Sequence, residues 1–415
     1  MQELKRVLFI GTVWPEPTSS AAGSRMLQII NFFLKQKWHV TFVSAAAKSE
    51  FSADLKKLGV TSLPVKINSP DFDGMIKQQS PNLVIFDRFM TEEQFGWRVA
   101  DNCPNAIRVL DTEDLHCLRV ARQNAFKKES VYSENDLLTE EITKREIASI
   151  YRSDLSLIIS DYEYSLLTNL FGIDESLLHY MPFLLDKVED TDFKKLPGFE
   201  ERDGFMHIGN FLHEPNWNAV LWLKEELWPL IRSKLPNAKL SIYGSYPSQK
   251  VHQLHNEREG FLIKGRAESS FEVLKNSKVL LAPLRFGAGL KGKLVEAMQC
   301  GTPSVTTEIG AEGIAGDLSW PGMIGNTKES ISESAVQLYL DKSLWTDAQR
   351  RGFEIINKRF NREEHEQRFK EKLEKLKNDL KSHRTNNFTG RMLMHHSSAS
   401  TRFMSKWIEE KNRKK

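Results

Sequence analysis

The sequence predicts an α/β protein of two doubly wound, Rossmann-like domains that face each other across a cleft. Three observations support this fold class. The chain has 415 residues, which is long for one hydrophobic core and suits two domains of about 180 residues each. Short, continuous apolar runs alternate with amphipathic stretches, as is typical of parallel strands covered on both faces by crossover helices. The alternation stops once, between Phe183 and Gly204, and then begins again.

The first half, residues 1–190, contains five apolar runs that each stop at a Gly, Ser or Asp. A helix from about residue 22 to 35 would connect the first two runs. Ser160, followed three residues later by Glu163, is typical of a capping box, so Asp161 and Glu163 are expected to open a helix. The predicted strands are 6–10, 39–44, 83–86, 107–110 and 155–159.

The second half, residues 200–360, repeats this pattern after an irregular linker that contains Pro197 and Gly198. Helices are expected at about 216–235, at 291–299 and through much of 328–380. The Lys- and Glu-rich segment 361–381 is predicted to be a solvent-facing helix that returns to the first domain. The predicted strands are 205–208, 239–243, 261–264, 279–284 and 304–307.

The charge is uneven along the chain. The net charge is only +3, yet residues 381–415 carry nine Lys or Arg against two Glu. We expect residues 382–415 to form a basic, partly disordered tail, with peripheral contact to an anionic membrane surface as the alternative. No nucleic acid partner is expected, because the rest of the chain is not basic.

The remaining composition argues for a cytoplasmic protein. Three Cys without metal-ligand spacing predict neither a disulfide framework nor a metal site. No run approaches the ~18 apolar residues of a membrane-spanning helix, and the N-terminus lacks the apolar core of a signal peptide.

The chemistry is concentrated in residues 285–303, which follow a predicted strand and open a helix. Gly287 and Gly289 would let backbone amides approach a phosphate closely, and the helix N-terminus near Leu290 favours negative charge. Lys291 and Lys293 add positive charge, so a diphosphate is the expected ligand. Glu296, about one and a half turns into the helix, could accept hydrogen bonds from two ribose hydroxyls.

Two other interpretations of this segment stay open. Gly287 to Gly292 could form a simple tight turn with a solvated Glu296. The same residues also spell G-x-G-x-x-G, and Glu308 or Glu312 lies near the offset of an NAD-binding acid, which would make the chain a dehydrogenase. Against NAD, the motif follows the fourth strand of its domain, and two Lys flank it.

The order of these segments resembles a known family. Gly287-Ala-Gly-Leu-Lys-Gly-Lys-Leu-Val-Glu-Ala-Met298, followed by residues 300–307 and Gly310-Ala-Glu-Gly313, is similar to the donor-site signature of the retaining glycosyltransferases called family 4 or group 1. Segments 205–216, 240–244, 263–266 and 109–116 support the resemblance, which covers residues 6 to about 360. It implies the GT-B fold and transfer of a sugar from a nucleotide-diphosphate sugar with retained configuration, without a required metal or other cofactor.

The resemblance also implies roles for individual residues. Glu296 would bind the ribose, the amides near Gly289 and Leu290 the diphosphate, and Lys291 the charge of the leaving group. The expected donor-binding residues are Gly209, Gly265, Arg266, Gly287, Gly289, Leu290, Lys293 and Glu296.

Two departures from the family pattern leave alternatives. Ala288 stands where relatives have a second Glu, and His213 to Asn216 replace an Arg-and-Lys phosphate clamp. We expect Arg285 and Lys291 to substitute for that clamp. A nucleotide-sugar-binding protein with a degenerate site, or a GT-B nucleotide-sugar epimerase, is the alternative function.

The first domain is expected to supply the acceptor side, where a saccharide, lipid or small molecule would bind. Gly11 ends the first predicted strand, and Gly23, Ser24 and Arg25 lie at the start of the following helix. His116, beyond the strand that ends near residue 110, matches a family position expected to point at the sugar and is the third catalytic candidate. Asp114 is assigned to the acceptor side, although acidic residues and a His in this position are as often structural.

Overall fold

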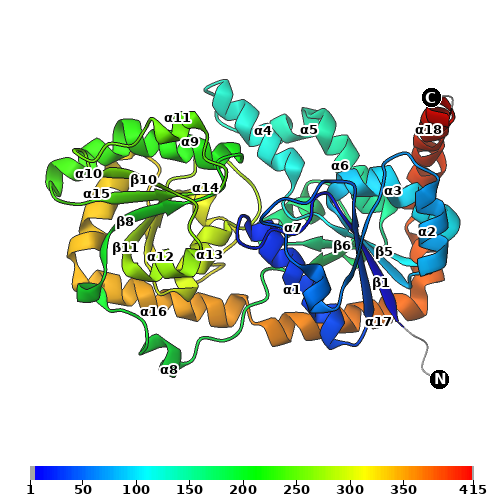
Figure 1. The fold of residues 1–415 in the computed structure, drawn as a ribbon, viewed down its shortest axis with the longest axis horizontal. Coiled ribbons are helices and arrows are strands. Elements are labelled where there is room, and N and C mark those ends of the chain that lie inside the picture. Colours follow the sequence, from blue (N-terminus) through cyan, green and yellow to red (C-terminus); the bar gives the residue numbers. More distant parts are fainter. Residues whose placement is uncertain (1–4, 414–415) are drawn as a thin grey trace.

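The computed structural model describes residues 5–413, except for the side chains at positions 190 and 396–399. It consists of two α/β domains, each with a parallel sheet, joined side by side (Figure 1). The expected fold class is therefore confirmed. No helix in this part of the chain combines the length and the apolar character that crossing a membrane requires.

The N-terminal domain contains a seven-stranded parallel sheet in the order β3-β2-β1-β4-β5-β6-β7. All five expected strands are present, and two short edge strands, β3 and β7, were missed because they carry little apolar periodicity. The strands are β1 (Arg6–Gly11), β2 (His39–Ser44), β3 (Thr61–Pro64), β4 (Leu83–Asp87), β5 (Ile107–Asp111), β6 (Leu155–Ile158) and β7 (Leu178–Tyr180). The helices are α1 (Ala21–Lys35), α2 (Asp71–Gln79), α3 (Arg88–Asn102), α4 (His116–Lys127), α5 (Glu134–Thr139), α6 (Glu141–Arg152) and α7 (Asp161–Asn169).

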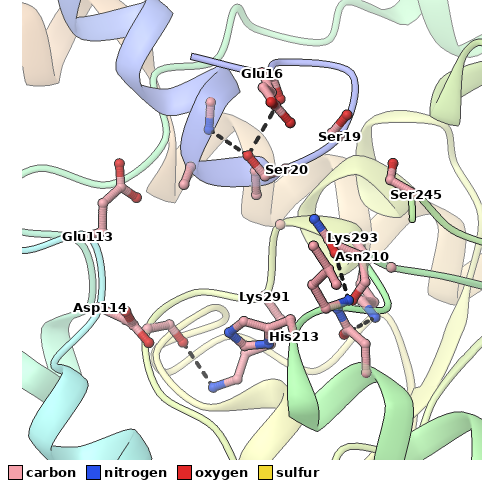
Figure 2. A pocket seen from close by; sticks show the side chains of 18 of the residues that line it. Glu16, Ser19, Ser20, Glu113, Asp114, Asn210, His213, Ser245, Lys291 and Lys293 are labelled. Carbon is pink, nitrogen blue, oxygen red and sulfur yellow. Dashed lines mark hydrogen bonds between the residues drawn. The ribbon is translucent and has the colours of Figure 1, made fainter. Parts of the chain in front are cut away.

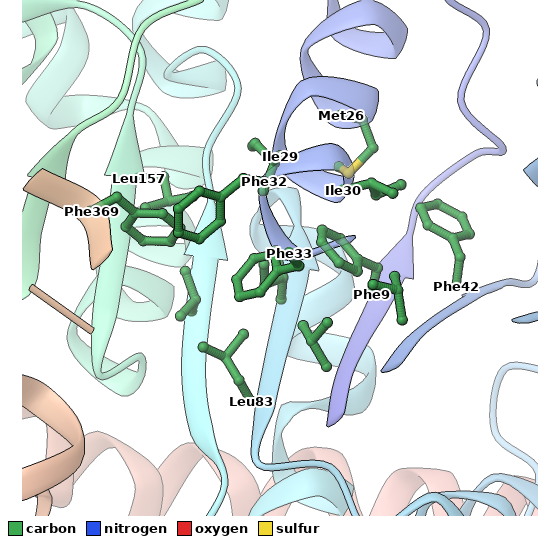
Figure 3. Packing of buried hydrophobic residues seen from close by; sticks show 14 of the residues in the cluster. Phe9, Met26, Ile29, Ile30, Phe32, Phe33, Phe42, Leu83, Leu157 and Phe369 are labelled. Atoms are coloured by element: carbon green, nitrogen blue, oxygen red, sulfur yellow. The ribbon is translucent and has the colours of Figure 1, made fainter. Parts of the chain in front are cut away.

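Helices cover both faces of this sheet because its strands are apolar on both sides. On one face, Phe9 and Phe42 of the sheet pack against Phe33 of α1 and, through Phe32, against Phe369 (Figure 3). Phe369 belongs to α17 (Arg362–Asn386), so the C-terminal part of the chain completes the first core. α2, α3, α4 and α6 cover the other face.

The C-terminal domain contains a six-stranded parallel sheet in the order β10-β9-β8-β11-β12-β13. Five strands were expected, and the short edge strand β13 was not. The strands are β8 (Asp203–Ile208), β9 (Leu240–Tyr243), β10 (Phe261–Gly265), β11 (Ser277–Ala282), β12 (Ser304–Thr306) and β13 (Gly322–Ile324). The helices are α9 (Glu214–Trp222), α10 (Trp228–Lys234), α11 (Gln249–His252), α12 (Ser270–Asn276), α13 (Gly292–Gln299), α14 (Glu308–Ala311), α15 (Lys328–Leu340) and α16 (Lys342–Arg359), with a π-helical turn between α9 and α10.

The chain crosses between the domains at two places that are hydrogen-bonded to each other. The first crossing follows Leu185 and includes α8 (Asp190–Phe193); the second lies between α16 and α17. The Leu185 amide donates to the Phe360 carbonyl at 2.8 Å, and the Arg362 amide donates to the Leu185 carbonyl at 2.8 Å. Both crossings are thus fixed at one point.

Residues after 382, expected to form a partly disordered tail, are helical instead. α17 runs to Asn386, and α18 (Phe388–Arg413) then packs against α3 and α6. Polar side chains hold it there, since the buried guanidinium of Arg98 donates to Ser405 and pairs with Glu409. Such contacts between residues about 310 positions apart leave no local sequence signal.

Candidate functional site at the domain interface

A cavity of about 660 Å³ lies between the two domains, where loops follow the carboxyl ends of strands from both sheets. Ligands of doubly wound sheets bind at this edge. Figure 2 shows Glu16, Ser19 and Ser20 of the N-terminal domain on one side of the pocket and Lys291, Lys293 and His213 of the C-terminal domain on the other.

The glycine-bearing turn faces this cavity at the start of α13, as the sequence predicts. Gly289 has a φ of 63°, and a Cβ there would lie 2.7 Å from Cβ of Asp114, so glycine is required. The Gly289 amide donates to Oε1 of Glu163 at 2.8 Å and is therefore occupied. Within residues 5–413, the amides of Leu290 and Lys291 have no hydrogen-bond partner. Of the two amides expected to face a phosphate, that of Gly289 is thus engaged with the protein, whereas that of Leu290 is available.

Both lysines of this segment line the cavity. The Lys291 ammonium donates to the Gly289 carbonyl at 2.9 Å, and that of Lys293 donates to Oδ1 of Asn216 at 2.8 Å. Burial lowers the pKa of Lys291 to about 8 and that of Lys293 to about 7, because the ammonium form loses its hydration. Neither has a carboxylate partner within salt-bridge distance among the described residues, so an anionic ligand would restore their charge.

Glu296 of α13 lines the same cavity. Burial raises the pKa of its carboxyl group, although the Ser270 hydroxyl and Lys293 act in the opposite direction. Gly209 lines the cavity as expected; a Cβ there would lie 2.7 Å from Cγ of Asn216 and 2.8 Å from Nζ of Lys293. Leu290 and Gly287 line it as well.

Arg266 lines the cavity, whereas Gly265, also expected to bind the donor, does not. The guanidinium of Arg266 stacks on Phe51 at 4.4 Å and donates to Oγ1 of Thr18 at 2.9 Å. Tyr246 makes a parallel contact, with its hydroxyl donating to Oε2 of Glu16 at 2.9 Å. The 13–20 loop of the N-terminal domain therefore closes over this end of the cavity.

Arg285 does not line the cavity, contrary to the expectation that it touches the leaving group. Its guanidinium lies between the rings of Phe126 and Trp222, at 4.7 and 5.0 Å, and Nε donates to Oδ1 of Asn218 at 2.8 Å. These contacts turn the side chain away from α13, which leaves Lys291 without the expected partner.

The expected acceptor-side glycines and their neighbours divide into two groups. Gly23 lines the cavity. A Cβ at this position would lie 2.5 Å from the carbonyl group of Glu16, so no larger residue fits there. Gly11 and Ser24 do not line it: Gly11 packs under Phe42, and the Ser24 hydroxyl donates to the Pro17 carbonyl at 2.9 Å. Both residues contact the backbone of the 13–20 loop and thereby support it.

Arg25, also expected to face the acceptor, is buried instead. Its side chain is 1% exposed, pairs with Asp111 and donates to the Met181 carbonyl at 2.9 Å. A guanidinium in this position joins α1 to the ends of β5 and β7, so Arg25 supports the wall from behind and does not contact the cavity.

His116 and Asp114 both reach the cavity. Burial lowers the pKa of His116 to about 4, so its imidazole is neutral at physiological pH. Burial would raise the pKa of Asp114, but Arg119, whose Nε lies 2.9 Å from Oδ2, and His116 lower it overall. A neutral imidazole beside a carboxylate is suited to hydrogen-bonding a sugar hydroxyl.

Several residues of the N-terminal wall were missed from the sequence. Glu163 was expected to cap α7; its Oε1 instead accepts hydrogen bonds from the amides of Leu115 and Gly289, at 3.0 and 2.8 Å, and so connects the two domains. Burial, reinforced by Asp114, raises its pKa to about 8. The correction follows from tertiary contact, because the Ser160 side chain makes no cap bond.

Two strained residues also face the cavity from adjacent strand ends. Arg88 and Glu113 have φ values of 69° and 61°, which side chains other than glycine rarely adopt. Burial, together with Asp111, raises the pKa of Glu113 to about 8. Strain of this kind is concentrated at functional sites, and no local pattern in the sequence signals it.

A buried ion pair holds the domains together beside the site. Arg122 of α4 makes two hydrogen bonds of 2.7 Å to Glu312 and donates to the Gly287 carbonyl at 2.9 Å. Glu312 is therefore engaged with a protein cation, which contradicts its use as the ribose-binding acid of an NAD site. No group of three or more His, Cys, Asp or Glu among the described residues is arranged to hold a metal ion.

Comparison with known proteins identifies the C-terminal domain. Residues 202–341 match the family model described as glycosyl transferases group 1. No curated protein matches the chain.

Three solved structures that share the fold cover 89–90% of this chain. Sucrose-phosphate synthase from Thermosynechococcus elongatus is 13% identical, with a TM-score of 0.66, over 90% of this chain and 99% of that chain. Anabaena HepE, in complex with UDP and glucose, is 14% identical, with a TM-score of 0.66, over 90% and 100%. A glycosyltransferase from Rickettsia africae is 12% identical, with a TM-score of 0.63, over 89% and 97%.

Proposed function

We propose that this chain is a glycosyltransferase, the expected enzyme class, because residues 202–341 match the group 1 glycosyl transferase model and the chain has the GT-B fold. The donor is a nucleotide-diphosphate sugar, held by α13 and the loops of the C-terminal sheet. The acceptor is a saccharide, a lipid or a small molecule and enters from the N-terminal domain. The sugar is transferred with retained configuration.

One observation carries this proposal: two unpaired amides and two lysines with lowered pKa values converge at the start of α13, inside a cavity between the domains. Amides at a helix N-terminus and nearby cations form a site for a diphosphate. A dianionic ligand would raise the pKa of both lysines again and gain their full charge on binding. Glu296, about one turn further along α13, is placed to accept the ribose hydroxyls.

Bond cleavage follows from this arrangement. When the bond between the sugar and the phosphate breaks, negative charge develops on the leaving diphosphate and positive charge on the sugar ring. Lys291 stabilises the leaving group, and a donor phosphate oxygen takes the acceptor proton on the same face. His116, neutral at physiological pH, orients the sugar through a hydrogen bond.

A screen of nucleotides tests the donor site directly. UDP is the first candidate, because the similar Anabaena structure contains UDP and glucose; GDP and ADP follow. A nucleotide at about 100 times its Kd should stabilise the protein by about 2.7 kcal/mol, which thermal unfolding detects, and Lys291→Ala should abolish most of that gain. Absence of stabilisation by every nucleotide would overturn the proposal.

A degenerate binding protein is the second candidate, favoured by Ala288 and by His213–Asn216 in place of the phosphate clamp. In that case, nucleotides should stabilise the protein against unfolding, but no acceptor should yield a transfer product and the donor should not be hydrolysed. An epimerase would instead convert the free nucleotide sugar into its epimer, which nuclear magnetic resonance of the product distinguishes from transfer with retention.

A further inference from the structure

The C-terminal helix α18 exposes large apolar side chains along one side. Phe388, Met392, Phe403, Met404 and Trp407 are 68%, 48%, 70%, 59% and 60% exposed. Four of them, at positions 388, 392, 403 and 407, are separated by four, eleven and four residues, which places them on one helical face. We call these five residues the apolar face of α18.

The opposite side of α18, which contacts the N-terminal domain, is polar. Arg98 of α3 is 1% exposed and connects Asp73, Ser405 and Glu409. Ser405 in turn lies 3.0 Å from Oδ1 of Asn68, and Arg402 pairs with Asp101 at 3.2 Å. A surface helix of a water-soluble protein normally buries its apolar side and exposes its polar side. In α18 this orientation is inverted, so water is not the expected environment of its outer face.

The charges around the apolar face favour an anionic surface. Lys406 and Lys411 are exposed beside it, and Lys411 lies 5.1 Å from the ring of Trp407. Of the two acidic residues nearby, Glu409 pairs with the buried Arg98, and Glu410 lies 3.4 Å from the exposed Arg413, so the cations outnumber the free carboxylates. Aromatic and Met side chains flanked by lysines are typical of helices that lie in the interface of an anionic membrane.

The dimensions also fit a helix lying flat on a membrane. With 26 residues, α18 is about 39 Å long. It is not apolar enough to cross a membrane. A second copy of the chain would bring Lys406 and Lys411 of two identical faces together, which like charges disfavour.

We propose that α18 docks the protein onto an anionic lipid surface, with its apolar face inserted among the headgroups and Lys406 and Lys411 paired with lipid phosphates. α18 is fixed to α3 and α6 of the N-terminal domain (Figure 1), so the docked membrane lies against the domain assigned to the acceptor. The docking itself does not depend on sugar transfer.

Flotation of the full-length protein with vesicles tests the proposal. The protein should float with vesicles of phosphatidylcholine mixed with phosphatidylglycerol and bind pure phosphatidylcholine more weakly. Phe403→Ser with Trp407→Ser should lower the affinity by more than about tenfold, since two exposed aromatic side chains no longer insert. Lys406→Glu with Lys411→Glu should remove the preference for the anionic vesicles and its dependence on salt.

The controls separate docking from folding and from self-association. All substituted residues are exposed, so the melting temperature should not change, and Leu340→Ser, at a 62% exposed residue of α15, should bind vesicles like the parent. Equal binding by the aromatic double variant and the parent would overturn the proposal. The proposal would also be overturned if the parent protein did not bind vesicles. This holds both for a monomeric parent and for a parent dimer that the aromatic substitutions dissociate. None of these readouts requires a nucleotide sugar.

Discussion

The two walls of the cavity are built on different principles. The part of the C-terminal wall at α13 is local: residues 287–296 supply two free amides, both lysines and the Glu296 carboxyl group from one turn and one helix. The N-terminal wall is assembled from the ends of separate strands and is supported by buried charges such as Arg25 and Asp111. We therefore expect substitutions in the C-terminal wall to affect catalysis and donor binding directly. Substitutions of the buried charges behind the N-terminal wall should affect mainly stability.

Lys291→Ala should have the largest effect on catalysis. It removes the cation that we propose stabilises the leaving diphosphate, so kcat should fall by about 10² to 10³, the usual loss for one preorganised charge-stabilising group. The melting temperature should stay constant or rise, because a desolvated lysine is lost. Steady-state kinetics and thermal unfolding check both parts; undiminished turnover would move the chemistry away from the C-terminal wall.

Asp111→Asn should have its main effect on stability. It leaves the Arg25 guanidinium, 1% exposed, without its closest carboxylate, which should cost about 3 kcal/mol of the free energy of unfolding. Urea denaturation measures this loss. Asp111→Leu with Arg25→Met is the matched control and should recover most of it. A variant that unfolds normally but has lost turnover would contradict the scaffolding role.

Glu296→Gln should weaken donor binding with little effect on kcat. An amide keeps the size of the side chain but accepts fewer hydrogen bonds from the ribose, so the KM for the donor should rise about tenfold, close to one charged hydrogen bond. Initial rates at varied donor concentration give the separate constants. If the KM stayed the same while kcat fell, Glu296 would act on the reaction itself and not on the ribose.

The pH dependence of UDP binding should be the smallest effect. Binding requires protonated lysines, and the pKa values of Lys291 and Lys293 in the empty cleft are about 8 and about 7. From pH 7 to pH 8 the affinity should fall about twofold if Lys291 alone matters and about tenfold if both do. Calorimetry in buffers of different ionisation enthalpy should show proton uptake, and Lys293→Met should reduce it.

The same lysines affect stability with the opposite sign. Their pKa is lower in the folded protein than in the unfolded chain, so the unfolded chain binds more protons between about pH 7 and the ordinary lysine value of about 10.4. The donor-free protein should therefore gain stability from them as the pH rises through this window. Urea denaturation of the parent and of Lys293→Met at several pH values isolates that contribution.

The sequence predicted the C-terminal wall well because its features are contiguous. A buried strand, a glycine-bearing turn and an amphipathic helix with Glu296 follow one another in residues 277–299, and each leaves a local pattern. The prediction that Arg285 lines the cavity was wrong, because the orientation of its side chain depends on Phe126 of the other domain. The central strands of both sheets were equally clear, whereas the short edge strands β3, β7 and β13 carry too few apolar residues.

The N-terminal wall could not be predicted because its contacts join distant residues. Glu163 bonds the amide of Gly289, 126 positions away, and nothing in its neighbourhood distinguishes it from a helix-capping residue. The strained backbone at Arg88 and Glu113 likewise depends on surrounding structure. The position of helix α18 depends on its contacts with Arg98, and the composition of the C-terminal segment cannot reveal that partner.

The paired crossings at Leu185 also constrain motion. Because both crossings are hydrogen-bonded to each other at one point, they can act as a hinge that permits rotation of the domains and opposes sliding. We therefore expect the domains to rotate about Leu185 and Phe360 when a donor enters. Spin labels in the 13–20 loop and beside Tyr246, at positions that leave Glu16 and Tyr246 unchanged, should separate widely in the open protein, while labels near Leu185 keep their spacing. The swing would break the Tyr246 to Glu16 hydrogen bond first, and release of the spent nucleotide would await it.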